Sequence, residues 1–541
     1  MGALFGYCIK AFVDLPKQLR WSYLPPLMVY AAAGISGLTA IVGSFFIKDY
    51  LNLSAAFLAG LGFWAGLPWA LKMPLGHLVD LIWKQKNIMV YAGAAVIATS
   101  LLIMHGLIGH TEAMAGIMAV ETWYVLSVIL APVGFVIQDV VADAMTVEAV
   151  PMRDSDGSAF SETEIKDMHT TMQMLGRFAI IGGSVLVALA NVVLFSGVDA
   201  LSETEKIALY ADIYLMALII PLVSIFGVVL AGWLAKKQAG TSRTSTTRTA
   251  ATAKEAEPQQ GRPPVNWTVL LGSLAFVIFS VGVGGFNLPY AQEIVFAGSA
   301  AIILFLISRL IILLPEKQRL GLVGTAIIIF VFRAMPNPGP GLTWFEIDVL
   351  LFNEQFFAVL SLLASVLTLA GIILLRPFMA DNSIARIMVI LSIAGALLFL
   401  PSIGMYYGLH QWTAALTGGV VDARFIAIIN TAVESPLGQV SMIPLLSWIA
   451  KNAPPQMKAT FFAVFASFTN LALSAAALGT KYLNQIFVVT REVKDKISGQ
   501  VVTTADYSEL GLLMISVAVI TLVLPVGAVM IIQQSRLRTT D

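Results

Sequence analysis

Long apolar stretches separated by short polar connections run along the whole chain. A helix rises about 1.5 Å per residue, so about 20 mostly apolar residues cross the hydrocarbon core of a bilayer. On this measure the pattern predicts an all-α membrane protein with about fourteen transmembrane helices. The predicted helices cover residues 24–47, 54–82, 88–108, 120–149, 169–196, 207–234, 267–286, 291–314, 321–346, 355–375, 385–407, 421–450, 459–483 and 509–533.

One polar stretch divides these helices into groups. Residues 236–266 are rich in Thr, Ser, Ala and Pro with scattered basic residues, a composition that cannot bury a core and is typical of a flexible linker. Two helices follow the linker before a second group of six begins. The predicted division is an interfacial cytoplasmic segment at 1–23, a six-helix half at 24–235, the linker at 236–266, two inserted helices at 267–314 and a second six-helix half at 315–541.

Composition narrows the class. Apolar residues make up 58% and charged residues 12%, which favours a membrane protein over a soluble enzyme, and the net charge of zero gives no reason to expect a nucleic-acid partner. The single cysteine, Cys8, excludes intramolecular disulfides and a Cys-rich metal site. No phosphate-binding Gly-rich motif and no cluster of nucleophiles or metal ligands occurs. We therefore expect no enzymatic activity, no metal and no cofactor.

The distribution of Lys and Arg predicts the orientation. With the N-terminus inside, the inner loops and helix ends hold about 21 basic residues and the outer ones about six. This asymmetry predicts that both termini are cytoplasmic, and it supports an even number of spans. No cleavable signal is recognisable, and the first span is expected to direct its own insertion.

Four sequence blocks carry a family resemblance. They are SFFIKDYLNLS from Ser44, LPWALKMPLGHLVD from Leu67, QDVVADAMTVE from Gln138 and APPQMKATFFAVFASFTNLAL from Ala453. Together they resemble the folate/biopterin transporter family of the major facilitator superfamily. An internal echo, in which Asp-x-Leu precedes a Phe eight residues beyond the Asp at Asp49 and again at Asp348, agrees with two repeated halves.

The resemblance implies a secondary transporter with its substrate held between the halves. The blocks LPWALK and QDVVADA also resemble the related muropeptide permeases, so a muropeptide is the alternative cargo. A sensor or assembly protein built on a transporter fold is a second alternative. The family usually has a cluster of arginines after its equivalent of Asp80, where this chain has only Lys84 and Lys86, so the resemblance leaves the substrate open.

Ionisable residues occur inside several predicted spans. Counted from the cytoplasmic ends, Asp139 lies about 16 Å deep, Lys72 about 15 Å, Arg177 about 13 Å and Asp143 about 10 Å. Asp139 and Asp143 are four residues apart and share one helix face. Two carboxylates this close in a poorly solvated site cannot both stay ionised without cations. Both are proton-coupling candidates, and a structural ion-pair network is the alternative.

A second group lies near the cytoplasmic surface. Gly76 and Asp80 match a loop pattern shared across the superfamily, and Lys84 is placed to pair with Asp80 between helices. Glu148 ends the QDVVADAMTVE block. We expect Gly76, Asp80, Lys84 and Glu148 to act in gating rather than in binding.

The second half contains one interrupted span. Pro336, Pro338 and Pro340 follow Arg333 near the membrane centre, and proline breaks the helical hydrogen-bond ladder. Unwound backbone at this depth is tolerated where it is buried in protein or lines a cavity. We expect Arg333 to bind an anionic group, with Glu434 as its alternative ion-pair partner or as a further titrating group.

These observations combine into one hypothesis. The protein is expected to be a monomer in the bilayer of a bacterial inner membrane that moves a pterin- or folate-like anion together with protons. The proton-coupling candidates are Asp139, Asp143 and Glu434, and the substrate-binding candidates are Arg333, Lys72 and Arg177.

Overall fold

The computed structural model describes most of the chain. It covers residues 19–70, 72–82, 85–151, 158, 160–245, 278–280, 282–284, 288–312, 315–438, 440, 458–494 and 501–539. Within these residues, nine helical stretches are long and apolar enough to cross a membrane. They are Trp21–Tyr50, Asn87–Gly109, Val120–Thr146, Met174–Ala200, Glu203–Lys237, Ala291–Arg309, Glu354–Leu374, Ile384–Tyr406 and Leu510–Gln534.

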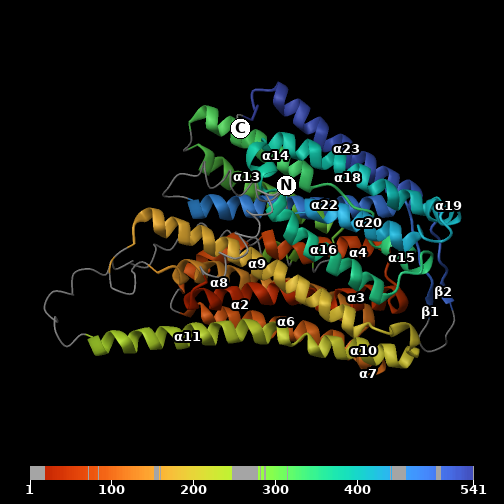
Figure 1. Cartoon of the computed structure of the whole chain (residues 1–541), viewed down its shortest axis with the longest axis horizontal. Helices are drawn as coiled ribbons and strands as arrows, with labels where there is room; N and C mark the ends of the chain where they lie inside the picture. The colour runs from red at the N-terminus through yellow and green to blue at the C-terminus, as the bar shows by residue number, and fades with distance from the viewer. Residues whose placement is uncertain are drawn as a thin grey trace.

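The first half is a bundle of helices drawn from red to yellow in Figure 1. Its elements are η1 Trp21–Tyr23, α2 Leu24–Gly34, η2 Ile35–Thr39, α3 Ala40–Tyr50, α4 Ala55–Ala70, α5 Lys72–Leu81, α6 Asn87–Gly109, α7 Thr111–Ala115, α8 Val120–Ala149, α9 Glu162–Leu194, η4 Val198–Ala200, α10 Glu203–Met216 and α11 Ile219–Ser245. The last of these helices continues to Ser245, so the first ten residues of the expected linker are helical; residues 246–266 lie outside the described part.

The second half lies beside the first and is drawn from green to blue (Figure 1). Its elements are α13 Ala291–Ile311, α14 Glu316–Arg333, α15 Pro340–Asp348, α16 Glu354–Leu374, α17 Arg376–Asp381, α18 Ile384–Tyr406, α19 Leu409–Leu416, α20 Ala423–Glu434, η5 Ser435–Leu437, α22 Lys458–Ile486, β1 Val493–Lys494, β2 Val501–Thr503 and α23 Leu510–Gln534. Strands β1 and β2 form an antiparallel pair in the connection between α22 and α23.

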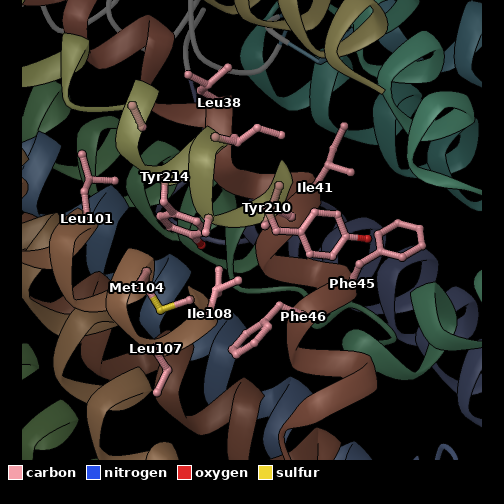
Figure 2. Packing of buried hydrophobic residues seen from close by; sticks show 14 of the residues in the cluster. Leu38, Ile41, Phe45, Phe46, Leu101, Met104, Leu107, Ile108, Tyr210 and Tyr214 are labelled. Atoms are coloured by element: carbon pink, nitrogen blue, oxygen red, sulfur yellow. The ribbon is translucent and has the colours of Figure 1, made fainter. Parts of the chain in front are cut away.

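The halves meet along two seams. Helix α4 packs against α22 along one seam, and α9 packs against α16 along the other. The largest apolar cluster consists of first-half residues together with Ala358 of α16, and Figure 2 shows part of it, where Phe45, Phe46 and Tyr210 lie among side chains of α6 and α10. Phe45 also meets Phe357 of the second half edge to face, with the ring centroids 5.9 Å apart. The core of the first half therefore continues into the seam between the halves.

The outer surface of the bundle is apolar. On α11, five large apolar residues three or four positions apart are each more than half exposed, which puts them on one face of the helix. They are Ile219, Leu222, Phe226, Val229 and Trp233. An unbroken apolar face of this kind is stable against hydrocarbon and not against water. The chain is an integral membrane protein.

One inserted helix touches both halves. The Gln292 side chain of α13 donates to the Gly60 carbonyl of α4 at 2.9 Å. The neighbouring Glu293 pairs with Lys481 of α22 at 2.9 Å and accepts a hydrogen bond from Tyr482. Helix α13, predicted from the sequence to be one of two inserted helices, thus contacts both sides of the seam between α4 and α22. The inserted helix expected at 267–286 falls largely outside the described residues.

Candidate functional site

A charged cluster forms where α2, α5 and α8 meet in the first half. Lys72 is the first residue of α5, while Asp139 and Asp143 lie one turn apart on α8. The Lys72 Nζ lies 2.5 Å from Asp139 Oδ2 and 2.7 Å from Asp143 Oδ2. Tyr30 of α2 donates its hydroxyl to Asp143 Oδ1 at 2.5 Å. We call Tyr30, Lys72, Asp139 and Asp143 the Lys72 cluster.

Charge in the Lys72 cluster is unbalanced. One ammonium group is shared by two carboxylates, so the three groups carry one excess negative charge when all are ionised. The side chains of Lys72, Asp139 and Asp143 are 25%, 16% and 46% exposed, respectively, so Asp139 is the best shielded from solvent. Poorly solvated carboxylates in a membrane protein need a cation, a proton or a cationic ligand. The cluster can hold or release one positive charge.

Arg177 stands apart from this contact network. It lies on α9, its side chain is exposed, and it acts on the Asp139 carboxylate through its charge. Among the described side chains, no acidic group lies within ion-pair distance of Arg177. Four groups were predicted to neutralise one another. The structure brings three of them, Lys72, Asp139 and Asp143, into direct contact. The fourth group, the guanidinium of Arg177, is exposed.

The expected gating residues are only partly described. Gly76 lies in α5, where an added Cβ would meet nothing within 4 Å. Asp80 also lies in α5, but its side chain and the whole of Lys84 are outside the described residues, so their expected contact is not addressed. Glu148 pairs with Lys86 at 2.6 Å, and the Lys86 side chain is 8% exposed. This pair joins the end of α8 to the start of α6.

The predicted break in the second half is present. Helix α14 ends at Arg333 and α15 begins at Pro340, with non-helical backbone between them. The Asn337 amide donates to Thr480 Oγ1 at 3.0 Å, and the Asn484 side chain donates to the Pro338 carbonyl at 3.2 Å. Polar side chains of α22 thus supply partners that the broken helix lacks.

Arg333 is the last residue of α14 and is half-buried beside this break. Glu434 is the last residue of α20, and its side chain is exposed. In the described part of the chain, no three His, Cys, Asp or Glu side chains gather as a metal site would require. The polar chemistry inside the described bundle therefore rests on carboxylates, ammonium and guanidinium groups, hydroxyls and amides.

Several hydrogen bonds around these groups were not predicted from the sequence. Tyr30 stands in an apolar run of α2, and Thr480 and Asn484 stand in an amphipathic helix far along the chain. A polar residue four positions after another, as Asn484 follows Thr480, indicates a shared helix face. Nothing local to either residue indicates that this face meets the break before α15.

Comparison with known proteins places the chain in a family. A model of the BT1 family matches residues 33–540, which is nearly the whole chain. The chain belongs to the BT1 family. A folate-biopterin transporter from Synechocystis sp. is 23% identical over 477 residues, covering 87% of this chain and 76% of that protein.

Solved structures with the same fold are more distant in sequence. A POT family transporter in complex with 5-aminolevulinic acid matches with a TM-score of 0.58 at 12% identity, covering 96% of each chain. The nucleoside transporter NupG matches with a TM-score of 0.51 at 13% identity, covering 96% of this chain and 100% of that one. These similarities confirm the major facilitator fold of the BT1 family chain, and at such identities they carry nothing about its cargo.

Proposed function

We propose that this protein moves a small organic anion of the pterin or folate class across the membrane by alternating access, together with protons. The observation that carries the proposal is the Lys72 cluster, in which one ammonium is shared between the carboxylates of Asp139 and Asp143. The name of the Synechocystis relative supports the substrate class.

The excess negative charge of the cluster supports proton coupling. When a proton neutralises one carboxylate, Lys72 pairs fully with the other, and the cluster becomes neutral. When the proton leaves, a positive charge is required again, and in this proposal the exposed guanidinium of Arg177 supplies it. A cluster that alternates between these states can couple proton movement to a change in helix packing. Asp139 and Asp143 are the coupling groups in this proposal, with Glu434 as a further titrating group.

The break between α14 and α15 supports an anion site in the second half. Arg333 ends α14 beside backbone that is held by side chains rather than by its own helical ladder. A guanidinium group binds a carboxylate through two parallel hydrogen bonds, and pterin conjugates and muropeptides both carry carboxylates. In this proposal Arg333 binds the anionic group of the cargo, and Lys72 and Arg177 contribute from the first half.

The remaining assignments follow from charge and sequence. Gly76, Asp80, Lys84 and Glu148 act in gating at the cytoplasmic surface, both termini face the cytoplasm, and a monomer in the bacterial inner membrane is the working unit. The orientation rests on the positive-inside distribution, and the gating roles rest on the superfamily loop pattern.

Uptake into proteoliposomes tests the proposal. Folate, a reduced pterin and an anhydro-muropeptide are offered in parallel, with and without an imposed pH gradient. Gradient-dependent accumulation of the pterin or of folate is the expected result. Accumulation of the muropeptide alone would show that the cargo is a muropeptide rather than a pterin or folate. Accumulation that does not depend on the pH gradient would contradict proton coupling. Absence of uptake of all three by folded protein would contradict the proposal.

A further inference from the structure

The connection between α22 and α23, two helices of the second half, reaches over to contact the first half. This connection includes β1 and β2, which Figure 1 shows at the right-hand end of the bundle near α15. Arg491 lies in it, two residues before β1, and is 3% exposed. Its guanidinium group reaches the last turn of α3 and the residues that follow, more than four hundred positions earlier in the chain.

Four backbone carbonyls of the first half surround the guanidinium of Arg491. Nε donates to the Lys48 carbonyl at 2.7 Å, and Nη1 donates to the Leu53 carbonyl at 2.9 Å. Nη2 donates to the Ile47 carbonyl at 2.8 Å and to the Leu51 carbonyl. The Cζ atom lies 4.0 Å from the centroid of the Trp344 ring of α15. We call this arrangement the Arg491 cage.

Helix physics explains why a cation binds there. The last carbonyls of a helix lack intrahelical partners, and the helix dipole gives that end a partial negative charge. Arginine presents several donors in a fixed plane and stacks on aromatic rings, so one side chain can satisfy the carbonyls and cover Trp344 at once. Burial lowers the pKa of Arg491 to about 10, which still leaves the guanidinium charged near neutral pH. The Arg491 cage therefore holds a full positive charge.

A second contact joins the halves beside the cage. Lys48 of α3 pairs with Asp348 of α15 at 2.6 Å and with its own neighbour Asp49 at 2.9 Å. The Tyr507 hydroxyl, in the same connection as Arg491, donates to the other oxygen of Asp348 at 2.5 Å. The end of α3 is thus bound by a charge pair and by the Arg491 cage, both supplied by the second half.

Hydrogen bonds also join the halves near the seam between α9 and α16, at the same end of the bundle. Tyr210 of α10 donates to the buried carboxylate of Glu354, the first residue of α16. The Asn353 side chain donates to Asp199 at 2.6 Å. Polar contacts between the halves therefore occur at both seams on the end of the bundle where α3 ends and α16 begins.

We infer that Arg491 is the latch that keeps this end of the transporter closed. Alternating access requires the halves to separate at this end, and separation withdraws the guanidinium from carbonyls of the first half. The four carbonyls then lose their donor, and the guanidinium of Arg491 loses its acceptors. The closed state is therefore favoured until other hydrogen bonds replace those of the Arg491 cage. The inference rests on transport by alternating access, but not on the cargo or on protons. By the predicted orientation this end is the outer mouth.

A thiol reporter tests the latch without any substrate. Ala55 of α4 is 2% exposed and lies in an apolar cluster whose other buried members all belong to the second half. In a Cys8→Ser background, Ala55→Cys is treated with a membrane-impermeant maleimide in vesicles of both orientations. Slow labelling is expected for the parent protein, because the closed end covers this position.

Arg491→Ala is expected to label about tenfold faster, because several hydrogen bonds to a charged group are lost from the closed state only. Arg424→Ala is the matched control. Arg424 donates to the Leu351 carbonyl and lies over the Phe356 ring, and all three residues belong to the second half. This control should label at the parent rate. Equal labelling of Arg491→Ala and its parent, with both proteins folded, would overturn the latch.

Arg491→Lys keeps the test decisive if Arg491→Ala does not accumulate. The lysine ammonium keeps the charge but cannot reach all four carbonyls. Arg491→Lys is therefore expected to label at a rate between those of the parent and of Arg491→Ala. Labelling of Arg491→Lys at the parent rate would again overturn the inference. In the Arg491→Ala protein, a short thiol cross-linker between Lys48→Cys and Asp348→Cys should restore slow labelling of Ala55→Cys, because it holds the same end closed. Because labelling needs no cargo, its outcome is independent of the uptake assay.

Discussion

The Lys72 ammonium lies 2.5 Å from the Asp139 carboxylate and thereby joins the start of α5 to the middle of α8. The same ammonium lies 2.7 Å from Asp143. A shared cation makes the protonation state of either carboxylate depend on the other. The helices that carry these groups are therefore coupled through charge, and several expected outcomes follow from this cluster and from the contacts around it.

Asp139→Asn is expected to abolish the dependence of uptake on the pH gradient while leaving the folded protein in the membrane. The amide does not ionise near neutral pH, so it cannot take up and release a proton as a carboxylate does, yet it keeps the shape of the side chain. Uptake is compared with and without a gradient. Asp212→Asn, which changes an exposed carboxylate on α10, should leave the gradient dependence unchanged. Gradient-driven uptake by Asp139→Asn would remove Asp139 from coupling.

Lys72→Met is expected to lower the free energy of unfolding by about 2 kcal/mol, because the shielded carboxylate of Asp139 and the partly exposed carboxylate of Asp143 lose the cation they share. The melting temperature of the detergent-solubilised protein measures the effect. Adding Asp139→Asn should recover much of the loss. Lys236→Met, at an exposed position of α11, is the control and should be neutral. A Lys72→Met protein as stable as its parent would show that another cation compensates the cluster.

Arg333→Ala is expected to weaken binding of the cargo that the uptake assay identifies by about tenfold or more, through loss of hydrogen bonds to its anionic group. Arg333→Lys should recover only part of the affinity, because an ammonium does not bind a carboxylate through two parallel bonds. Arg309→Ala, on the exposed face of α13, is the control for loss of positive charge. Unchanged affinity in Arg333→Ala would return Arg333 to a purely structural role.

Gly339→Ala is expected to destabilise the break before α15 by about 1–3 kcal/mol, because its backbone has a positive φ that side chains disfavour. That φ is +73°, and an added Cβ would lie 2.9 Å from Asn484 Nδ2. Gly395→Ala is the control: in the middle of α18 its Cβ would meet nothing within 4 Å. Equal melting temperatures for the two variants would contradict this account of the break.

Gly183→Ala is expected to destabilise the contact between α2 and α9 by about 1–3 kcal/mol through overpacking. An added Cβ at Gly183 would lie 2.9 Å from the Cα of Gly34. The adjacent Gly182 offers a matched control, since its Cβ would meet nothing within 4 Å. Gly182→Ala should be neutral or slightly stabilising in the same thermal unfolding measurement. The reverse order of stabilities would show that the two helices do not depend on this close approach.

The division between sequence and tertiary information is clear at particular residues. Apolar runs of membrane-spanning length determined the class, because the bilayer imposes that length on any helix that crosses it. Local rules also determined the break after Arg333, since proline acts on its own helix, and they placed Asp139 and Asp143 on one face of α8 through helical spacing. These are effects of neighbours in the chain.

Tertiary structure decided the partners. Tyr30 meets Asp143 across 113 positions, and Arg491 meets the end of α3 across more than four hundred. Neither pairing has a local pattern, because a membrane helix can present a polar side chain to many neighbours and only packing selects one. The amino-acid sequence alone was enough to identify a helical membrane protein with charges inside its spans. How the helices pack decided which carboxylates share the Lys72 ammonium and which carbonyls surround Arg491.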